Sequence, residues 1–126
     1  TALTAGASCT ATAVAGQIGD SDAFDPPQNP VGNVVRTFSV DQAPGVLATT
    51  PADGGTISAD SDLSVSFTEP VNFAAGSFTL ECPTGTAVPF TVSGSGSATA
   101  TINPTGNLPV GTACRLTVLA PQIADV

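Results

Sequence analysis

Acidic side chains gather in one short stretch, where Asp20, Asp22 and Asp25 are separated by one or two residues. Carboxylate oxygens placed close together are the ligands that Ca²⁺ prefers. The stretch lacks the full loop pattern and the bidentate Glu of a known calcium motif, so a solvated turn between two strands is the favoured interpretation. The sequence indicates no other cofactor, and Asp20, Asp22 and Asp25 are the candidate Ca²⁺ ligands.

A second set of carboxylates, Asp60, Asp62 and Glu69, lies close together in the sequence. Two such groups could in principle act as a general acid and base. They are more simply interpreted as charges of turns and strand edges. A serine nucleophile would need a base, and the chain has no His and no Lys. The sequence therefore predicts no catalytic residues and no enzyme activity.

The three cysteines are Cys9, Cys82 and Cys114, with no closely spaced pair and no His to complete a zinc site. Cys82 and Cys114 are predicted on inward strand faces. A bond between them would close a loop of about 33 residues, worth roughly 3–4 kcal/mol in the loop-entropy model. We favour this disulfide over two buried thiols. An odd number of cysteines in a secreted chain indicates that Cys9 has its partner outside this module.

The charge is sparse and one-sided, with a net charge of −8 and Arg36 and Arg115 as the only basic side chains. No basic patch can form, which argues against nucleic acid and anionic membranes as partners. No apolar run approaches the roughly 20 residues of a membrane span. Low charge with abundant Thr and Ser is associated with exported bacterial proteins, so we expect an extracellular or cell-surface location. The outward-facing Thr and Ser are candidate sites for O-linked glycans.

Strict alternation of apolar and polar residues predicts the strands that must position these groups. Turn signals separate the strands at 51–55, 93–97 and 103–111, and no segment has a convincing helical period. Short, regularly spaced strands favour an antiparallel sandwich. The predicted inward-facing sets are Leu63, Val65 and Phe67; Phe78, Leu80 and Cys82; Val88, Phe90 and Val92; Ala98, Ala100 and Ile102; Cys114, Leu116 and Val118; and Val34, Phe38 and Val40, a set that Arg36 interrupts. Pro89 cannot donate a backbone N–H, which predicts an edge strand or a bulge there.

The two ends of the chain resemble each other without a gap. Residues 3–20 read LTAGASCTATAVAGQIGD and residues 108–125 read LPVGTACRLTVLAPQIAD, a constant offset of 105 residues. This period is about the length of one immunoglobulin-like domain. We expect residues 1–41 to be the closing strands of a preceding or neighbour-completing module. Residues 42–126 are then a module that lacks its last strand. The absence of an initial Met further suggests a processed product or a piece of a longer chain.

Residues 46–126 resemble the bacterial immunoglobulin-like domain of S-layer proteins, adhesins and multidomain secreted enzymes. The resemblance is carried by the motifs at 49–71, 76–82, 92–118 and 122–126, including the PADGG turn and the FTEPV bend. Residues 1–41 resemble the end of the same domain. The resemblance implies an all-β immunoglobulin-like sandwich, here an out-of-register cut of the repeat, with a structural or adhesive role and no catalytic machinery.

Three functions remain open at this point. The chain is expected to be the subunit of a surface fibre assembled head to tail as a homopolymer, with residues 33–40 donated to an acceptor edge formed partly by residues 108–120. The predicted interface residues are Val34, Val35, Phe38 and Val40. Alternatively, it is a passive stalk repeat of a large adhesin or S-layer protein, with flanking repeats as partners. A ligand- or carbohydrate-binding module is the weakest of the three, because the chain has no Trp or Tyr to form a sugar platform.

Overall fold

A computed structural model describes residues 2–22, 24 and 26–126. The chain divides into two compact units, Thr1–Ala43 and Pro44–Val126, and each is described by itself. Helical structure in the described residues is confined to 3₁₀ turns of three residues.

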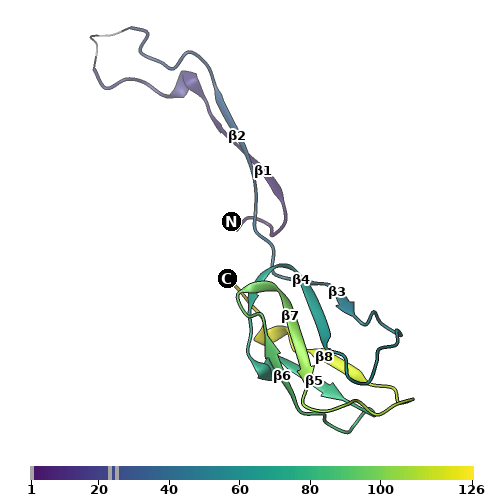
Figure 1. Ribbon diagram of the computed structural model, residues 1–126. Coiled ribbons are helices and arrows are strands. Elements are labelled where there is room, and N and C mark those ends of the chain that lie inside the picture. Colours follow the sequence, from purple (N-terminus) through teal and green to yellow (C-terminus); the bar gives the residue numbers. More distant parts are fainter. Residues whose placement is uncertain (1, 23, 25) are drawn as a thin grey trace. The chain divides into compact units, whose positions relative to one another are not determined.

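The N-terminal unit is a long hairpin (Figure 1). Strand β1 (Ser8–Ala13) pairs antiparallel with β2 (Val34–Ser39), so that Cys9 lies opposite Phe38 and Ala13 opposite Val34. The 3₁₀ turn η1 (Ala15–Gln17) follows β1 directly. Among the described residues of this unit only Ala15 is buried. An isolated two-stranded hairpin without a core is marginally stable in water.

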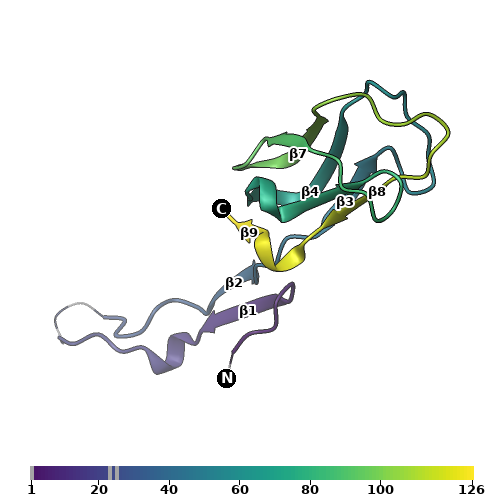
Figure 2. The same ribbon diagram turned by 90° about the horizontal axis from the view of Figure 1, so that it is seen from below.

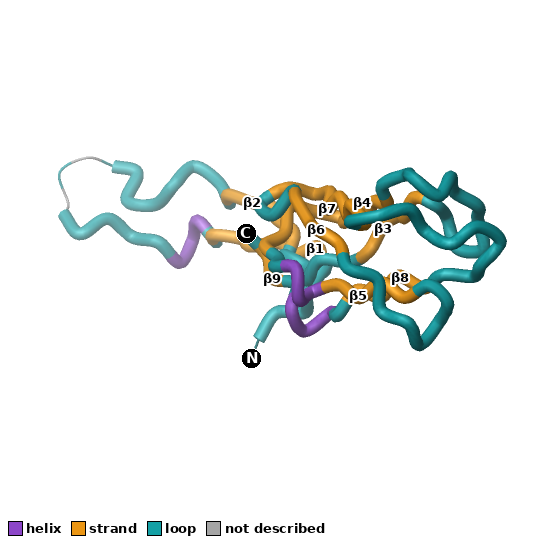
Figure 3. The backbone as a smooth tube through the Cα atoms, turned by 60° about the horizontal axis from the view of Figure 1, so that its bottom comes forward, coloured by secondary structure: helices purple, strands orange, loops and turns teal. Residues whose placement is uncertain are grey.

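The C-terminal unit contains the remaining strands in two layers. The larger sheet has the order β3-β4-β7-β6, and β9 pairs with the far end of β4, while β5 and β8 form a separate antiparallel pair. Figure 3 shows β5 and β8 facing the larger sheet. The bounds are β3 Val46–Thr50, β4 Leu63–Asn72, η2 Ala75–Ser77, β5 Phe78–Glu81, β6 Phe90–Ser93, β7 Ser97–Pro104, β8 Arg115–Val118, η3 Ala120–Gln122 and β9 Ala124–Asp125.

The core lies between these two layers and follows the predicted alternation. The larger sheet contributes side chains of β4 and β7, and the smaller contributes those of β5. The buried members of the cluster are Leu63, Val65, Phe67, Val71, Phe78, Leu80, Cys82, Ala100, Ile102 and Leu108. Leu116 and Val118 of β8 are partly buried and pack against this cluster. A core of such small side chains is confined to the C-terminal unit.

The edge strand β6 agrees with the sequence expectations, whereas three other strand details differ from them. Val34 and Phe38 of β2 were expected on an inward face and are exposed, because the described residues of the N-terminal unit form no second layer over β2. β6 begins at Phe90, directly after Pro89, and lies at an edge of its sheet, which agrees with the missing N–H of proline. Cys114, however, was expected on an inward face and is exposed, because it precedes the first residue of β8. Strand β3 was not predicted; its residues are mostly exposed and its pairing with β4 shifts register between Val46 and Ala48.

Candidate assembly interface

The sequence similarity of the two ends extends to their backbone conformation (Figure 2). The turns η1 and η3 begin and end 105 residues apart, at Ala15 and Ala120 and at Gln17 and Gln122. The residue before each turn has nearly the same φ, −86° at Val14 and −87° at Leu119. The segment β1–η1 is thus folded like the segment β8–η3.

A glycine in the left-handed region precedes both strands. Gly6 has φ 72° and Gly111 has φ 69°, again 105 residues apart. This conformation is unstrained only for residues without a Cβ. The two glycines therefore show that the backbone enters both strands with the same conformation, in addition to the similarity of the two sequences.

The two copies of this segment differ in their neighbours. β1 has β2 on one side, whereas β8 has β5 as its strand partner among the described residues. The Ser77 hydroxyl donates to the Gln122 carbonyl (3.0 Å) and accepts the N–H of Ala74 (3.2 Å), which fastens η3 to η2. In the hairpin, the N–H of Ala15 donates to Asn33 Oδ1 instead (2.9 Å).

Strand β2 exposes the apolar side chains that were predicted to form an interface. Val34 is 46% exposed, Val35 51% and Phe38 45%. Val40, which follows β2, is partly buried, and its N–H donates to the Ala7 carbonyl (2.8 Å). Apolar side chains lie on both faces of β2, and the described residues of its own unit provide no second sheet that packs against them.

A disulfide joins Cys82 and Cys114, 32 residues apart in the sequence. Glu81 lies opposite Arg115 in the β5–β8 pair, so the two cysteines are the next opposed residues in the same register. The disulfide predicted from the sequence is therefore confirmed. Cys9 occupies the position in β1 that Cys114 occupies next to β8, is partly exposed, and is a free thiol here.

The same strand pair carries an exposed ion pair. Arg115 Nη2 lies 2.8 Å from Glu81 Oε2. A hydrogen bond from the N–H of Gly85, together with the Arg115 guanidinium, lowers the pKa of Glu81 below its ordinary value. Thr10 stands at the position of Arg115 in β1 and cannot make this ion pair.

The acidic residues expected to bind Ca²⁺ are Asp20, Asp22 and Asp25; Asp25 lies outside the described residues. Asp20 Oδ1 accepts the N–H of Asp22 (3.3 Å), and Asp22 Oδ1 accepts the N–H of Phe24 (3.1 Å). Such contacts are typical of turns built by aspartate. The calcium site stays a prediction.

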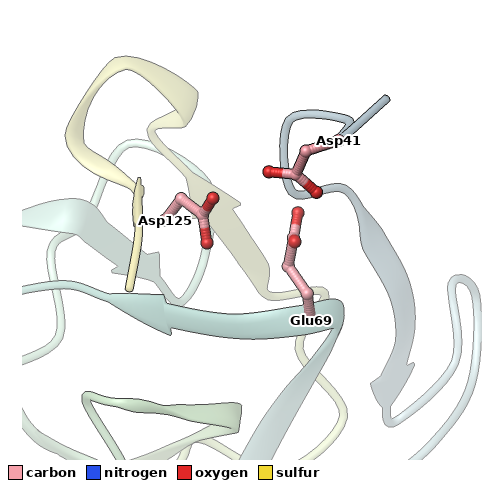
Figure 4. A group of neighbouring side chains, drawn as sticks. All are labelled: Asp41, Glu69 and Asp125. Atoms are coloured by element: carbon pink, nitrogen blue, oxygen red, sulfur yellow. The ribbon is translucent and has the colours of Figure 1, made fainter. Parts of the chain in front are cut away.

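The carboxylates Asp60, Asp62 and Glu69 are not brought together as a pair of catalytic groups. Asp60 and Asp62 precede β4 and line an open depression of about 250 Å³ together with residues 103–107. Glu69 lies seven residues further along β4, on the order of 20 Å away at the usual rise of a strand. Glu69 instead lies near Asp125, their oxygens within 4.8 Å (Figure 4); Asp41, also drawn there, belongs to the N-terminal unit.

Comparison with known families identifies the class of protein. Residues 40–126 match the bacterial Ig-like domain family, and the chain belongs to that family. The fold predicted from the sequence, an all-β antiparallel Ig-like sandwich, is confirmed. No curated protein and no solved structure matched the chain.

Membership of this family defines the chain as a structural module. Bacterial Ig-like domains are generally non-catalytic and are typically found at the cell surface or outside the cell. Among the described residues, no helix is both long and apolar enough to cross a membrane.

The sequence signals did not identify the free backbone edge of β8. Residues 108–120 were expected to contribute to an acceptor edge, but alternation alone does not say which edge of a strand is already paired. That information comes from the pairing of β8 with β5.

Proposed function

We propose that this chain is a secreted, non-catalytic module of a surface fibre whose repeats join head to tail. Each repeat supplies a strand of the β2 type to the open edge of β8 in its neighbour. Residues 1–41 then act as the closing strands of an adjoining module, and residues 42–126 form a module that takes its last strand from outside.

The observation that carries this proposal is the matched geometry of the two ends. β1–η1 and β8–η3 have the same fold at an offset of 105 residues, yet only β1 is paired with a β2 strand. A strand of the β2 type beside β8 gives both copies the same environment. It also covers apolar side chains of β2 that are exposed in the hairpin, and burial of apolar surface is the main driving force for association.

Cys9 reflects the repeat relation between modules. Its counterpart Cys114 is bonded to Cys82 across the β5–β8 pair, so Cys82 of another copy of this chain is already paired. In a longer polypeptide, Cys9 is the Cys114-type residue of the preceding module and would bond to the Cys82-type residue of that module in an oxidising, extracellular environment.

A second candidate is a passive stalk repeat of a large adhesin or S-layer protein. The 105-residue repeat favours it equally, because a covalent array would place the same strand next to β8. The mass of the natural polypeptide distinguishes the two. A chain of one repeat length supports assembly, and a chain with many further copies supports the stalk.

Electron microscopy of the concentrated intact chain tests the fibre directly. We expect unbranched filaments for the wild type and for Arg36→Ala, and their loss for Arg36→Pro. Proline removes the backbone N–H of β2 that the sheet requires, whereas alanine removes only the side chain. Isolated monomers or dimers of the wild type at high concentration would exclude the fibre.

A further inference from the structure

We infer that β2 of a second copy leaves its own β1 and pairs with β8 of the first copy. The two strands pair in one defined register, with Leu116 opposite Arg36 and Val118 opposite Val34. This inference rests on the proposed head-to-tail assembly and specifies its contact surface. The argument comes from the direction of the backbone groups on each strand.

Among the residues that the structure describes, the pairing of β8 with β5 leaves a defined set of backbone groups of β8 without a hydrogen-bond partner. The N–H of Leu119 donates to the Ser77 carbonyl (2.9 Å), so Leu119 directs its backbone groups toward β5. Successive residues of a strand point these groups to opposite edges. Thr117 and Arg115 therefore also bond to β5, and Leu116 and Val118 direct their N–H and C=O groups to the other edge.

The opposite strand gives the same result. Leu80 lies opposite Leu116, and the carbonyl of Leu80 accepts the N–H of Val88 (2.8 Å) on the edge of β5 that faces away from β8. Leu80 and Leu116 are thus a non-hydrogen-bonded pair. The backbone groups of Leu116 remain available for another strand.

In the hairpin, the equivalent residues of β1 already hold β2. The hydrogen bond from the Val40 N–H to the Ala7 carbonyl fixes which opposed residues of β1 and β2 are hydrogen-bonded pairs. Because such pairs alternate with non-hydrogen-bonded pairs, Ala11 is hydrogen-bonded to Arg36 and Ala13 to Val34. Residues 105 positions after Ala11 and Ala13 are Leu116 and Val118. The free edge of β8 therefore corresponds to the edge of β1 that binds β2. On both edges the equivalent residues direct their backbone N–H and C=O groups outward.

Exchange of β1 for β8 improves the contacts of β2. Directly opposed residues share a sheet face, so Val34 gains Val118 in place of Ala13 and lies toward the core that Leu116 and Val118 already contact. The hairpin that is given up buries only Ala15 among its described residues. Arg36 falls on the same face, and its long side chain can carry the guanidinium past the sheet edge to water.

The register predicts which engineered cysteines can bond. Thr117 and Val35 become a non-hydrogen-bonded pair, with Cα atoms about 4.5 Å apart, close enough for a disulfide. The intact chain with Cys9→Ala, Val35→Cys and Thr117→Cys is oxidised at high concentration. The matched control carries Arg36→Cys in place of Val35→Cys, because a shift of one residue turns the side chain to the opposite face. Chains with one engineered cysteine control for bonds between identical positions.

A ladder of covalent oligomers in the Val35→Cys, Thr117→Cys chain, lost in the Arg36→Cys control, is the expected result. A ladder in the Arg36→Cys control alone would overturn the register and leave the fibre proposal intact. A disulfide closed within one monomer would overturn the exchange between copies. Monomers by sedimentation with no ladder in either variant would overturn both the register and the assembly.

Discussion

Glu81 and Arg115 illustrate how a single exposed pair responds to pH. The pKa of Glu81 is lowered in the folded chain by the Gly85 N–H and by Arg115. A carboxyl group with a lowered pKa stabilises the fold above its unfolded pKa, and this contribution is lost as the pH falls through the folded value.

Replacement of Glu81 by Gln tests this contribution. We expect Glu81→Gln to lower the free energy of unfolding slightly at pH 7, and the difference from wild type to be smaller at an acidic pH below the lowered pKa of Glu81, because protonated glutamic acid resembles glutamine. Urea unfolding of both chains at the two pH values measures it. A difference of equal size at both pH values would contradict the assignment.

The acidic residues show how far sequence proximity can mislead. Asp62 and Glu69 are close in the sequence, but the extended backbone of β4 holds them far apart in space. Glu69 and Asp125 are far apart in the sequence and lie near each other in space. The pairing of β9 with β4 creates this second proximity. A two-residue strand has too little pattern to be predicted from sequence.

At the scale of elements, the disulfide connects the end of β5 to the start of β8 and is expected to hold the smaller sheet together. Replacement of Cys82 and Cys114 by alanine should cost about 2–5 kcal/mol of unfolding free energy, since the unfolded chain loses its cross-link. Denaturant unfolding of the intact chain measures the loss.

Cys9→Ala is the matched control for that variant. Cys9 lies in the N-terminal unit and has no disulfide partner there. Its replacement should leave the unfolding of the C-terminal unit unchanged. Equal destabilisation by Cys9→Ala and by the double variant would mean that the effect does not come from the β5–β8 cross-link.

Strands with one buried face were predictable, whereas β3, which has no buried face, was not. Leu63, Val65 and Phe67 alternate with polar residues because β4 covers the core with one face only. β3 has no such alternation, since most of its side chains are exposed. The free edge of β8 was beyond prediction for a different reason: backbone direction depends on pairing, which side-chain identity does not reveal.

At the scale of the whole molecule, the repeat relates two units that differ in self-sufficiency. The C-terminal unit has a core between its two sheets, whereas the described part of the N-terminal hairpin buries only Ala15. The same segment thus occurs once inside a core, as β8–η3, and once outside one, as β1–η1. This contrast is the physical reason to expect that a neighbouring module completes the fold.

Hydrogen exchange of the β8 amides tests this central claim most directly. In dilute solution we expect the N–H groups of Leu116 and Val118 to exchange rapidly, and that of Thr117, which bonds to β5, to be protected. On concentration into the assembled state, Leu116 and Val118 should become protected while Thr117 changes little. Rapid exchange of Leu116 and Val118 at every concentration would contradict the account.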